Sequence, residues 1–215
     1  NINLGLVNKE KFDLKLDKYI TNITVQNGKG VKTYNFENST LAKVEIPASQ
    51  VAKSTIVLEY KIAITNEGNV AGYAKNIVDY KPKDVAFNSS LNNNWYAGND
   101  GNLYSTELEN TLINPGETKE VKLILTKQMT ESNTGMINNI AEINSSYNEQ
   151  GIDDKDSTAG NKAQGEDDIG NADAIITVKT GGTAIYTLLG IIILAILSIG
   201  IYTIKTKTLK GKEVY

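Results

Sequence analysis

The sequence predicts an all-β sandwich followed by one membrane-spanning helix, and three observations support this. Between residues 11 and 178, β-branched runs are separated by Asn, Gly and Asp, with no sustained 3.6-residue pattern. Several of these runs alternate apolar and polar side chains, as half-buried strands do. Residues 184–204 form an apolar run without a charged side chain, and a lysine-rich tail follows.

Eight segments carry the strand signal, and each is bounded by residues that favour turns. Asn27-Gly28, Glu67-Gly68-Asn69 and Asn114-Pro115-Gly116-Glu117 are the clearest turns, because Gly and Asn accept positive φ and Pro fixes its own φ. The expected strands span residues 12–25, 31–36, 41–46, 54–66, 70–80, 120–127, 136–144 and 172–179.

The strand at 54–66 shows which faces are buried. Its even-numbered positions from Ile56 to Ile64 are apolar, whereas Glu59 and Lys61 lie at odd positions. The strand from residue 12 alternates in the same way, and Lys18 falls at one of its inward positions. Two antiparallel sheets packed face to face are the simplest way to bury such faces.

The apolar run at 184–204 predicts a transmembrane helix, because a helix of this length covers roughly 30 Å, the thickness of a bilayer core. The tail after it has a net charge of +3 and the part before it −6, so the positive-inside rule places the tail in the cytoplasm. We therefore expect a single-pass protein of the cell membrane with residues 1–182 outside the cell. The alternative is a buried core helix, which is usually shorter. The basic residues of the tail are Lys205, Lys207, Lys210 and Lys212, opposed by Glu213.

Composition excludes several kinds of function. The chain has no Cys, His or Arg, so it cannot form disulfides, Ser-His-Asp or Cys-His catalytic sites, or zinc sites of the His/Cys kind. The acidic outer part lacks a basic patch, which argues against nucleic acid as a partner. We expect a protein that is not an enzyme. The N-terminus shows no signal peptide although the orientation requires export, so we expect further domains upstream in a longer chain.

Trp95, the single tryptophan, lies in the Asn- and Gly-rich segment 89–105 beside Tyr96. One interpretation makes these rings, with Tyr104, a platform on which a sugar stacks. The other makes Trp95 a core residue beneath a long loop, and a lone tryptophan favours this second interpretation.

The runs VLEYKIAITNEGNVAGYAKNIVDYKPKDVAF, NNNWYAGNDGNLY, LINPGETKEVKLILTK and INNIAEI occur in this order. Together they resemble the immunoglobulin-like conserved repeat domain of Gram-positive cell-surface proteins. The resemblance covers about half of the chain. It implies an immunoglobulin-like β-sandwich of the kind found in adhesins, pilin-like proteins and surface stalks. The preceding FDLKLDKYI and LAKVEI resemble the first strands of related fimbrial domains that form intramolecular isopeptide bonds.

An isopeptide bond would need a Lys, an Asn and a carboxyl group side by side in the core. Lys18 and Asn139 both fall at inward positions of their strands. Glu59 is the acid that the family pattern suggests, although its parity is outward unless a bulge intervenes. Asp79 is the substitute acid and Lys43 the substitute amine. In the alternative interpretation, Lys18 reaches solvent at a strand end and Asn139 bonds to backbone.

The segment 151–173 is the densest acidic stretch of the chain. Its carboxylates could supply the oxygen ligands that Ca²⁺ prefers. The alternative is a solvated acidic loop, which is the commoner outcome. The candidate calcium ligands are Asp153, Asp154, Asp156, Glu166, Asp167 and Asp168.

A second motif borders the apolar run. Thr180 and Gly181, followed by the apolar run and the basic tail, resemble a sortase sorting signal that is cut between Thr and Gly. The Leu-Pro that should precede is Thr177-Val178 here, so a permanent membrane anchor is preferred over attachment to the cell wall.

These inferences divide the chain into five parts. Residues 1–40 hold N-terminal strands that pack on or precede the sandwich, 41–150 form the immunoglobulin-like sandwich, and 151–182 hold the acidic loop, the last strand and a juxtamembrane linker. Residues 183–204 form the transmembrane helix, with the bilayer as partner, and 205–215 the cytoplasmic tail. The expected function is a membrane-anchored surface stalk that presents distal domains. The alternatives are a glycan- or calcium-binding module and a sortase-processed wall protein.

Overall fold

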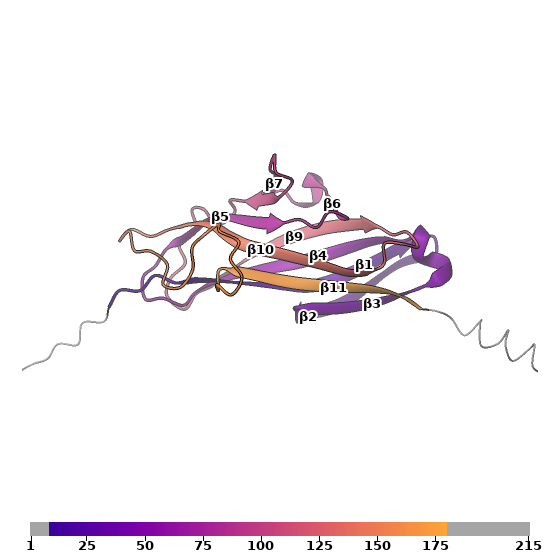
Figure 1. Cartoon of the computed structure of the whole chain (residues 1–215), viewed down its shortest axis with the longest axis horizontal. Helices are drawn as coiled ribbons and strands as arrows, with labels where there is room; N and C mark the ends of the chain where they lie inside the picture. Colours follow the sequence, from indigo (N-terminus) through magenta and orange to yellow (C-terminus); the bar gives the residue numbers. More distant parts are fainter. Residues whose placement is uncertain (1–8, 180–215) are drawn as a thin grey trace, which may run out of the picture.

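The computed structural model describes residues 9–179, which fold into two β-sheets packed face to face (Figure 1). One sheet has the strand order β2-β1-β4-β9-β6 and the other β3-β11-β10-β5-β8-β7. The prediction of an all-β sandwich is therefore confirmed. The first sheet contains β1 (Leu14–Asn27), β2 (Gly30–Ser39), β4 (Thr55–Asn66), β6 (Ala86–Phe87) and β9 (Thr118–Gln128). The second contains β3 (Leu41–Pro47), β5 (Tyr73–Tyr80), β7 (Trp95–Ala97), β8 (Leu103–Ser105), β10 (Gly135–Tyr147) and β11 (Ile169–Lys179).

The apolar faces predicted from alternation meet between the two sheets. Every second residue of β4 from Ile56 to Ile64 is fully buried, whereas Glu59 and Lys61 lie on the outer face. In β1 the register shifts between Ile20 and Asn22. This bulge moves the buried parity from even positions before it to odd positions such as Ile23 after it.

One strand pair departs from the prediction of an all-antiparallel sandwich. β3 pairs with β11 in parallel, with Val44 opposite Ile176. The chain leaves the edge of one sheet at the end of β2 and crosses at once to the edge of the other sheet. There β3 runs in the same direction as β11, the last strand of the described chain.

The two strands expected to pack on or precede the sandwich belong to one of its sheets, because β1 lies between β2 and β4. β1 and β11 both contribute to the core, so the expected boundaries at residues 40 and 150 fall inside one folded unit. The two ends of the described chain lie at opposite ends of its long axis (Figure 1).

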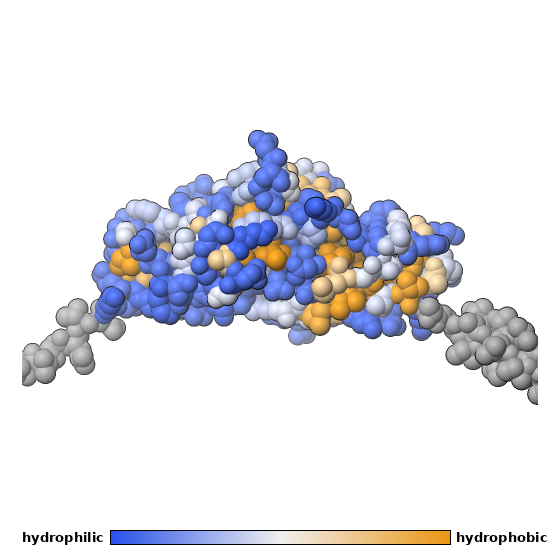
Figure 2. Space-filling model, viewed as in Figure 1, coloured by the Kyte–Doolittle hydropathy of each residue, from blue (hydrophilic) through white to orange (hydrophobic). Residues whose placement is uncertain are grey.

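Short elements complete the fold. The 3₁₀ helices η1 (Ala48–Lys53) and η2 (Ser89–Leu91) connect strands. Within residues 9–179, no helix is both long and apolar enough to cross a membrane, and the predicted span at 183–204 lies outside that range. The view in Figure 2 shows a largely hydrophilic surface, with apolar side chains gathered mainly toward the end where β11 finishes.

Candidate functional site

The core between the sheets contains an ion pair that is completely out of water. Lys18 Nζ on β1 contacts Asp79 Oδ2 on β5, and both side chains are 0% exposed. The two residues come from opposite sheets, so their contact crosses the sandwich. Long charged side chains are almost never fully buried unless they are paired or have a function.

Strand register explains why this pair forms. Lys18 pairs with Ile62 of β4 and lies between the buried Leu16 and Ile20, so its alternation points it inward. Asp79 lies opposite Ala141 of β10 in the second sheet. Parity predicted the inward position of Lys18, and Asp79 was named as the substitute acid. The sequence alone did not show that these two side chains meet.

Asn139 completes the group. It lies on β10 two residues from Ala141, which makes it a diagonal cross-strand neighbour of Asp79 on the same face. Its side chain is fully buried, and neither Nδ2 nor Oδ1 has a hydrogen-bond partner. The alternative in which Asn139 bonds to backbone is therefore wrong. A buried amide with both ends unpaired is costly and calls for an explanation.

Tyr60 of β4 closes the site from the side of the first sheet. Its ring centroid lies 4.9 Å from Lys18 Nζ, and its hydroxyl is buried without a partner. Burial raises the pKa of the Tyr60 hydroxyl, so this group stays protonated. Sequence analysis did not single out Tyr60, although its even parity in β4 already placed it among the core residues.

Burial also shifts the pKa of both partners in the ion pair. It lowers the pKa of Lys18, against the opposing attraction of Asp79. It raises the pKa of Asp79, against the opposing attraction of Lys18. Both shifts favour a neutral amine beside a protonated carboxyl. We call Lys18, Asp79, Asn139 and Tyr60 the core cluster.

The other two candidates for an isopeptide bond, Glu59 and Lys43, lie outside the core, so neither can take part in the bond. Glu59 lies on the outer face of β4 and forms an ion pair with Lys122 at 2.7 Å. The bulge in β1 does not turn it inward, because the shift occurs on the neighbouring strand. Lys43 on β3 is 58% exposed and lies 3.7 Å from Glu45. Both residues lie on outward-facing positions of their strands, and this keeps them away from the core cluster.

The acidic candidates divide into three groups. Asp154, Asp156 and Asp167 come together with Asp13, which sequence analysis did not single out, and we call these four residues the aspartate cluster. Asp153 is exposed and outside this cluster.

Glu166 and Asp168 form the third group, and both lie outside the aspartate cluster. Glu166 accepts hydrogen bonds from Thr158 N at 3.0 Å and from Asn161. Asp168 is 2% exposed, and burial followed by the nearby charge of Glu142 raises its pKa to about 7.

Trp95 is a core residue, as the favoured interpretation predicted. It is 4% exposed, and its indole N–H donates to the Lys122 carbonyl at 2.8 Å. Tyr96 is 51% exposed and stacks on Tyr104, with ring centroids 5.8 Å apart. Of the three residues considered for sugar stacking, only the two tyrosines are accessible.

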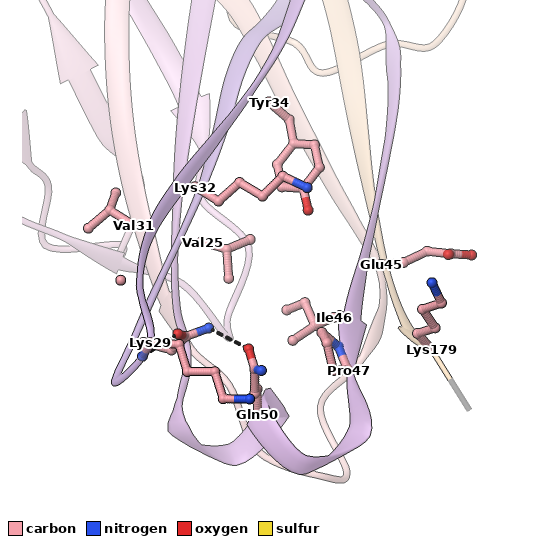
Figure 3. Close-up of a pocket in the computed structure, with 12 residues that line it drawn as sticks. Val25, Lys29, Val31, Lys32, Tyr34, Glu45, Ile46, Pro47, Gln50 and Lys179 are labelled. Carbon is pink, nitrogen blue, oxygen red and sulfur yellow. Dashed lines mark hydrogen bonds between the residues drawn. The ribbon is translucent and has the colours of Figure 1, made fainter. Parts of the chain in front are cut away.

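A pocket of about 370 Å³ lies between the β1–β2 hairpin and the end of β3 (Figure 3). The β1–β2 hairpin forms one wall, with Lys29, Lys32 and Tyr34, and the end of β3 forms the other, with Ile46. Lys32 lies over the Tyr34 ring at 4.4 Å from its centroid. This pocket contains none of the residues of the core cluster. The sorting-like residues Thr180 and Gly181 lie outside the described residues.

No family model and no curated protein matches the chain. Among solved structures, the crystal structure of the CARDB domain of a Pyrococcus furiosus protein in complex with di-metal ions is 14% identical. It covers 80% of this chain and 100% of its own, with a TM-score of 0.36. A solution NMR structure of the same domain has the same identity and coverage and a TM-score of 0.34. Likeness at this level carries no inference about this chain.

Proposed function

We propose that the chain is a structural domain of a bacterial cell-surface protein, locked by an isopeptide bond between Lys18 and Asn139. The observation that supports this most directly is the buried pair of Lys18 and Asp79 beside an Asn139 amide that has no hydrogen bond. A structural ion pair would need no unpaired amide next to it. In the proposed reaction Lys18 is the nucleophile, Asn139 the electrophile and Asp79 the general acid.

The reaction requires no external reagent. The neutral Lys18 amine attacks Cγ of Asn139, while the protonated Asp79 carboxyl polarises Oδ1 of the amide. A C–N bond forms between Nζ and Cγ, and the bond from Cγ to Nδ2 breaks. Asp79 takes one proton from the attacking nitrogen and gives one to the leaving nitrogen, so one ammonia molecule departs, the new amide keeps one N–H and Asp79 ends protonated as it began. The apolar surroundings favour the neutral starting groups.

The position of the bond suits a domain that carries tension. Lys18 and Asn139 lie on opposite sheets, so the bond would join the sheets covalently. Tension applied at residues 9 and 179 acts at opposite ends of the long axis (Figure 1). The segment between Lys18 and Asn139 holds β4, β5 and β9 and could not be extended while the bond is intact.

The location at the cell surface is part of this proposal. The apolar run at 184–204 and its basic tail support a membrane anchor that directly follows the sandwich. The sandwich would then stand outside the membrane and hold distal domains away from the bilayer.

Intact-mass spectrometry tests the bond. The purified chain should weigh less than its sequence by one ammonia molecule. Lys18→Met, Asn139→Ala and Asp79→Asn should each restore the full sequence mass of the variant. Asn138→Ala is the matched control, because Asn138 is the exposed neighbour on the same strand, and it should still lose ammonia. A wild-type chain at its full sequence mass would refute the bond.

A second candidate function rests on the exposed Tyr96 and its stacking on Tyr104. Asp100 accepts a hydrogen bond from the Tyr104 hydroxyl at 2.7 Å and fixes that ring. Such an aromatic surface could bind a sugar ring. Glycan-array binding that is lost in Tyr96→Ala would favour this function. Absence of binding to any glycan would leave the stalk as the better account.

A further inference from the structure

The end of the sandwich at which the described chain begins carries the aspartate cluster, in which Asp13 is buried, Asp154 and Asp167 are partly buried and Asp156 is exposed. One carboxylate oxygen from each of Asp13, Asp154, Asp156 and Asp167 lies within 4.8 Å of the others. Asp13 immediately precedes β1, whereas the other three belong to the loop between β10 and β11. The group therefore joins two segments that are far apart in sequence.

Acidic side chains often gather without a ligand, but Asp13 differs from the usual case. It is 1% exposed, and its Oδ1, buried from water, has no hydrogen-bond partner. Asp167 also has a buried and unpaired Oδ1. A carboxylate oxygen that is removed from water and left unpaired destabilises the fold unless a cation binds to it.

The backbone holds these carboxylates in place. Asp154 Oδ2 accepts from the backbone N–H of Leu14 at 2.8 Å, and its Oδ1 accepts from Ser157 Oγ at 2.9 Å. The Leu16 N–H donates to the Asp167 carbonyl at 2.8 Å. The Lys155 N–H donates to the Phe12 carbonyl at 3.0 Å. The loop is thus tied to the start of β1 on both sides of the cluster.

Charge in the cluster is unbalanced. Lys11 contacts Asp13 Oδ2, and Lys155 Nζ lies 2.6 Å from Asp156 Oδ2. Two lysines against four carboxylates leave a local charge of −2. Both lysines are partly exposed, at 34% and 51%, so each can turn toward solvent.

We infer that the aspartate cluster binds one Ca²⁺ ion. Ca²⁺ takes six to eight oxygen ligands at about 2.3–2.6 Å, so oxygens on opposite sides of one ion lie roughly 5 Å apart. Four oxygens within 4.8 Å of one another fit one such shell. Mg²⁺ is usually held by only one or two carboxylates, which makes a site of four aspartates better suited to Ca²⁺.

The ion would fasten the start of β1 to the loop before β11. It would thereby stiffen the end of the domain through which tension enters. This role is independent of the isopeptide bond, which lies in the core between the sheets and involves none of the four aspartates.

Calorimetric titration of the whole 215-residue chain in detergent with CaCl₂, after treatment with a chelator, tests the inference. We expect one ion per chain and a higher melting temperature with Ca²⁺. MgCl₂ at the same concentration should give a smaller rise. Absence of both heat and thermal shift with CaCl₂ would overturn the inference.

Three variants make the test specific. Asp156→Asn removes an exposed ligand without disturbing the core and should weaken binding by about tenfold or more. Asp153→Asn changes the same charge outside the cluster and should leave affinity within about twofold of the wild type. Lys155→Gln removes a competing positive charge and should tighten binding. Equal losses in Asp156→Asn and Asp153→Asn, or weaker binding in Lys155→Gln, would contradict a site at this position.

Discussion

The core cluster allows a sharp prediction for Asn139→Ala. This substitution removes the electrophile of the proposed bond but leaves the contact between Lys18 and Asp79 in place. The amide of Asn139 makes no hydrogen bond in the structure, so its removal from an unlinked chain would cost little. Any large loss of stability therefore measures the covalent link.

The expected magnitude follows from chain entropy. A link between residues 18 and 139 closes a loop of roughly 120 residues, which stabilises the fold by about 4.9 kcal/mol when treated like a disulfide. A domain of roughly 170 residues has an unfolding entropy near 0.36 kcal/mol/K at its midpoint. The melting temperature of Asn139→Ala should therefore lie about 14 °C below that of the wild type.

Scanning calorimetry and denaturant unfolding of four chains provide the assay: wild type, Lys18→Met, Asn139→Ala and the double variant. If the bond exists, either single change breaks it, and the second change adds little. The coupling energy from the double-mutant cycle should then be about 5 kcal/mol. Additive effects within about 0.5 kcal/mol, or a loss below about 1 kcal/mol in Asn139→Ala, would refute the reasoning.

Three further predictions concern other parts of the fold. Acrylamide should quench Trp95 fluorescence poorly in the native chain, because the indole is 4% exposed, and efficient quenching would contradict the buried position. Gly72→Ala should lower the melting temperature by about 4 °C or more, because a Cβ there would lie 2.7 Å from a backbone oxygen of β10; an unchanged melting temperature would show that the strand can move aside. Hydrogen bonds from Lys119 and Asn114 lower the pKa of Glu117 to about 2, so its contribution to stability is present above about pH 4.5 and is lost as pH falls toward 2. Glu117→Gln should therefore melt below the wild type at pH 6 and alongside it at pH 2, and an equal difference at both pH values would contradict this pKa.

Alternation of side chains was sufficient to predict most of the sandwich, because β4, β9 and β10 each have one buried and one solvated face. It failed for β6, β7 and β8, which have only two or three residues and so no measurable period. It also could not show the parallel pairing of β3 with β11, since parallel and antiparallel edges bury the same face.

The candidate site was predictable only in part, for the same reason. Parity placed Lys18 and Asn139 in the core and made Glu59 doubtful as the acid. The choice of Asp79 depended on which strand of the second sheet lies opposite β1, and periodicity does not contain that information. Asp13 went unnoticed because it is an isolated acid at the start of a strand. Only the folded loop brings the other three aspartates beside it.

Peptide mapping of the denatured chain tests the central claim most directly. Trypsin cleaves after lysine, and a Lys18 side chain in amide linkage blocks cleavage there. The account predicts one branched peptide in which residues 16–29 are joined to residues 128–155, with a mass lower than the sum of the two linear peptides by one ammonia molecule. Two separate peptides, one of them ending at Lys18 and the other carrying an intact Asn139 amide, would contradict the account.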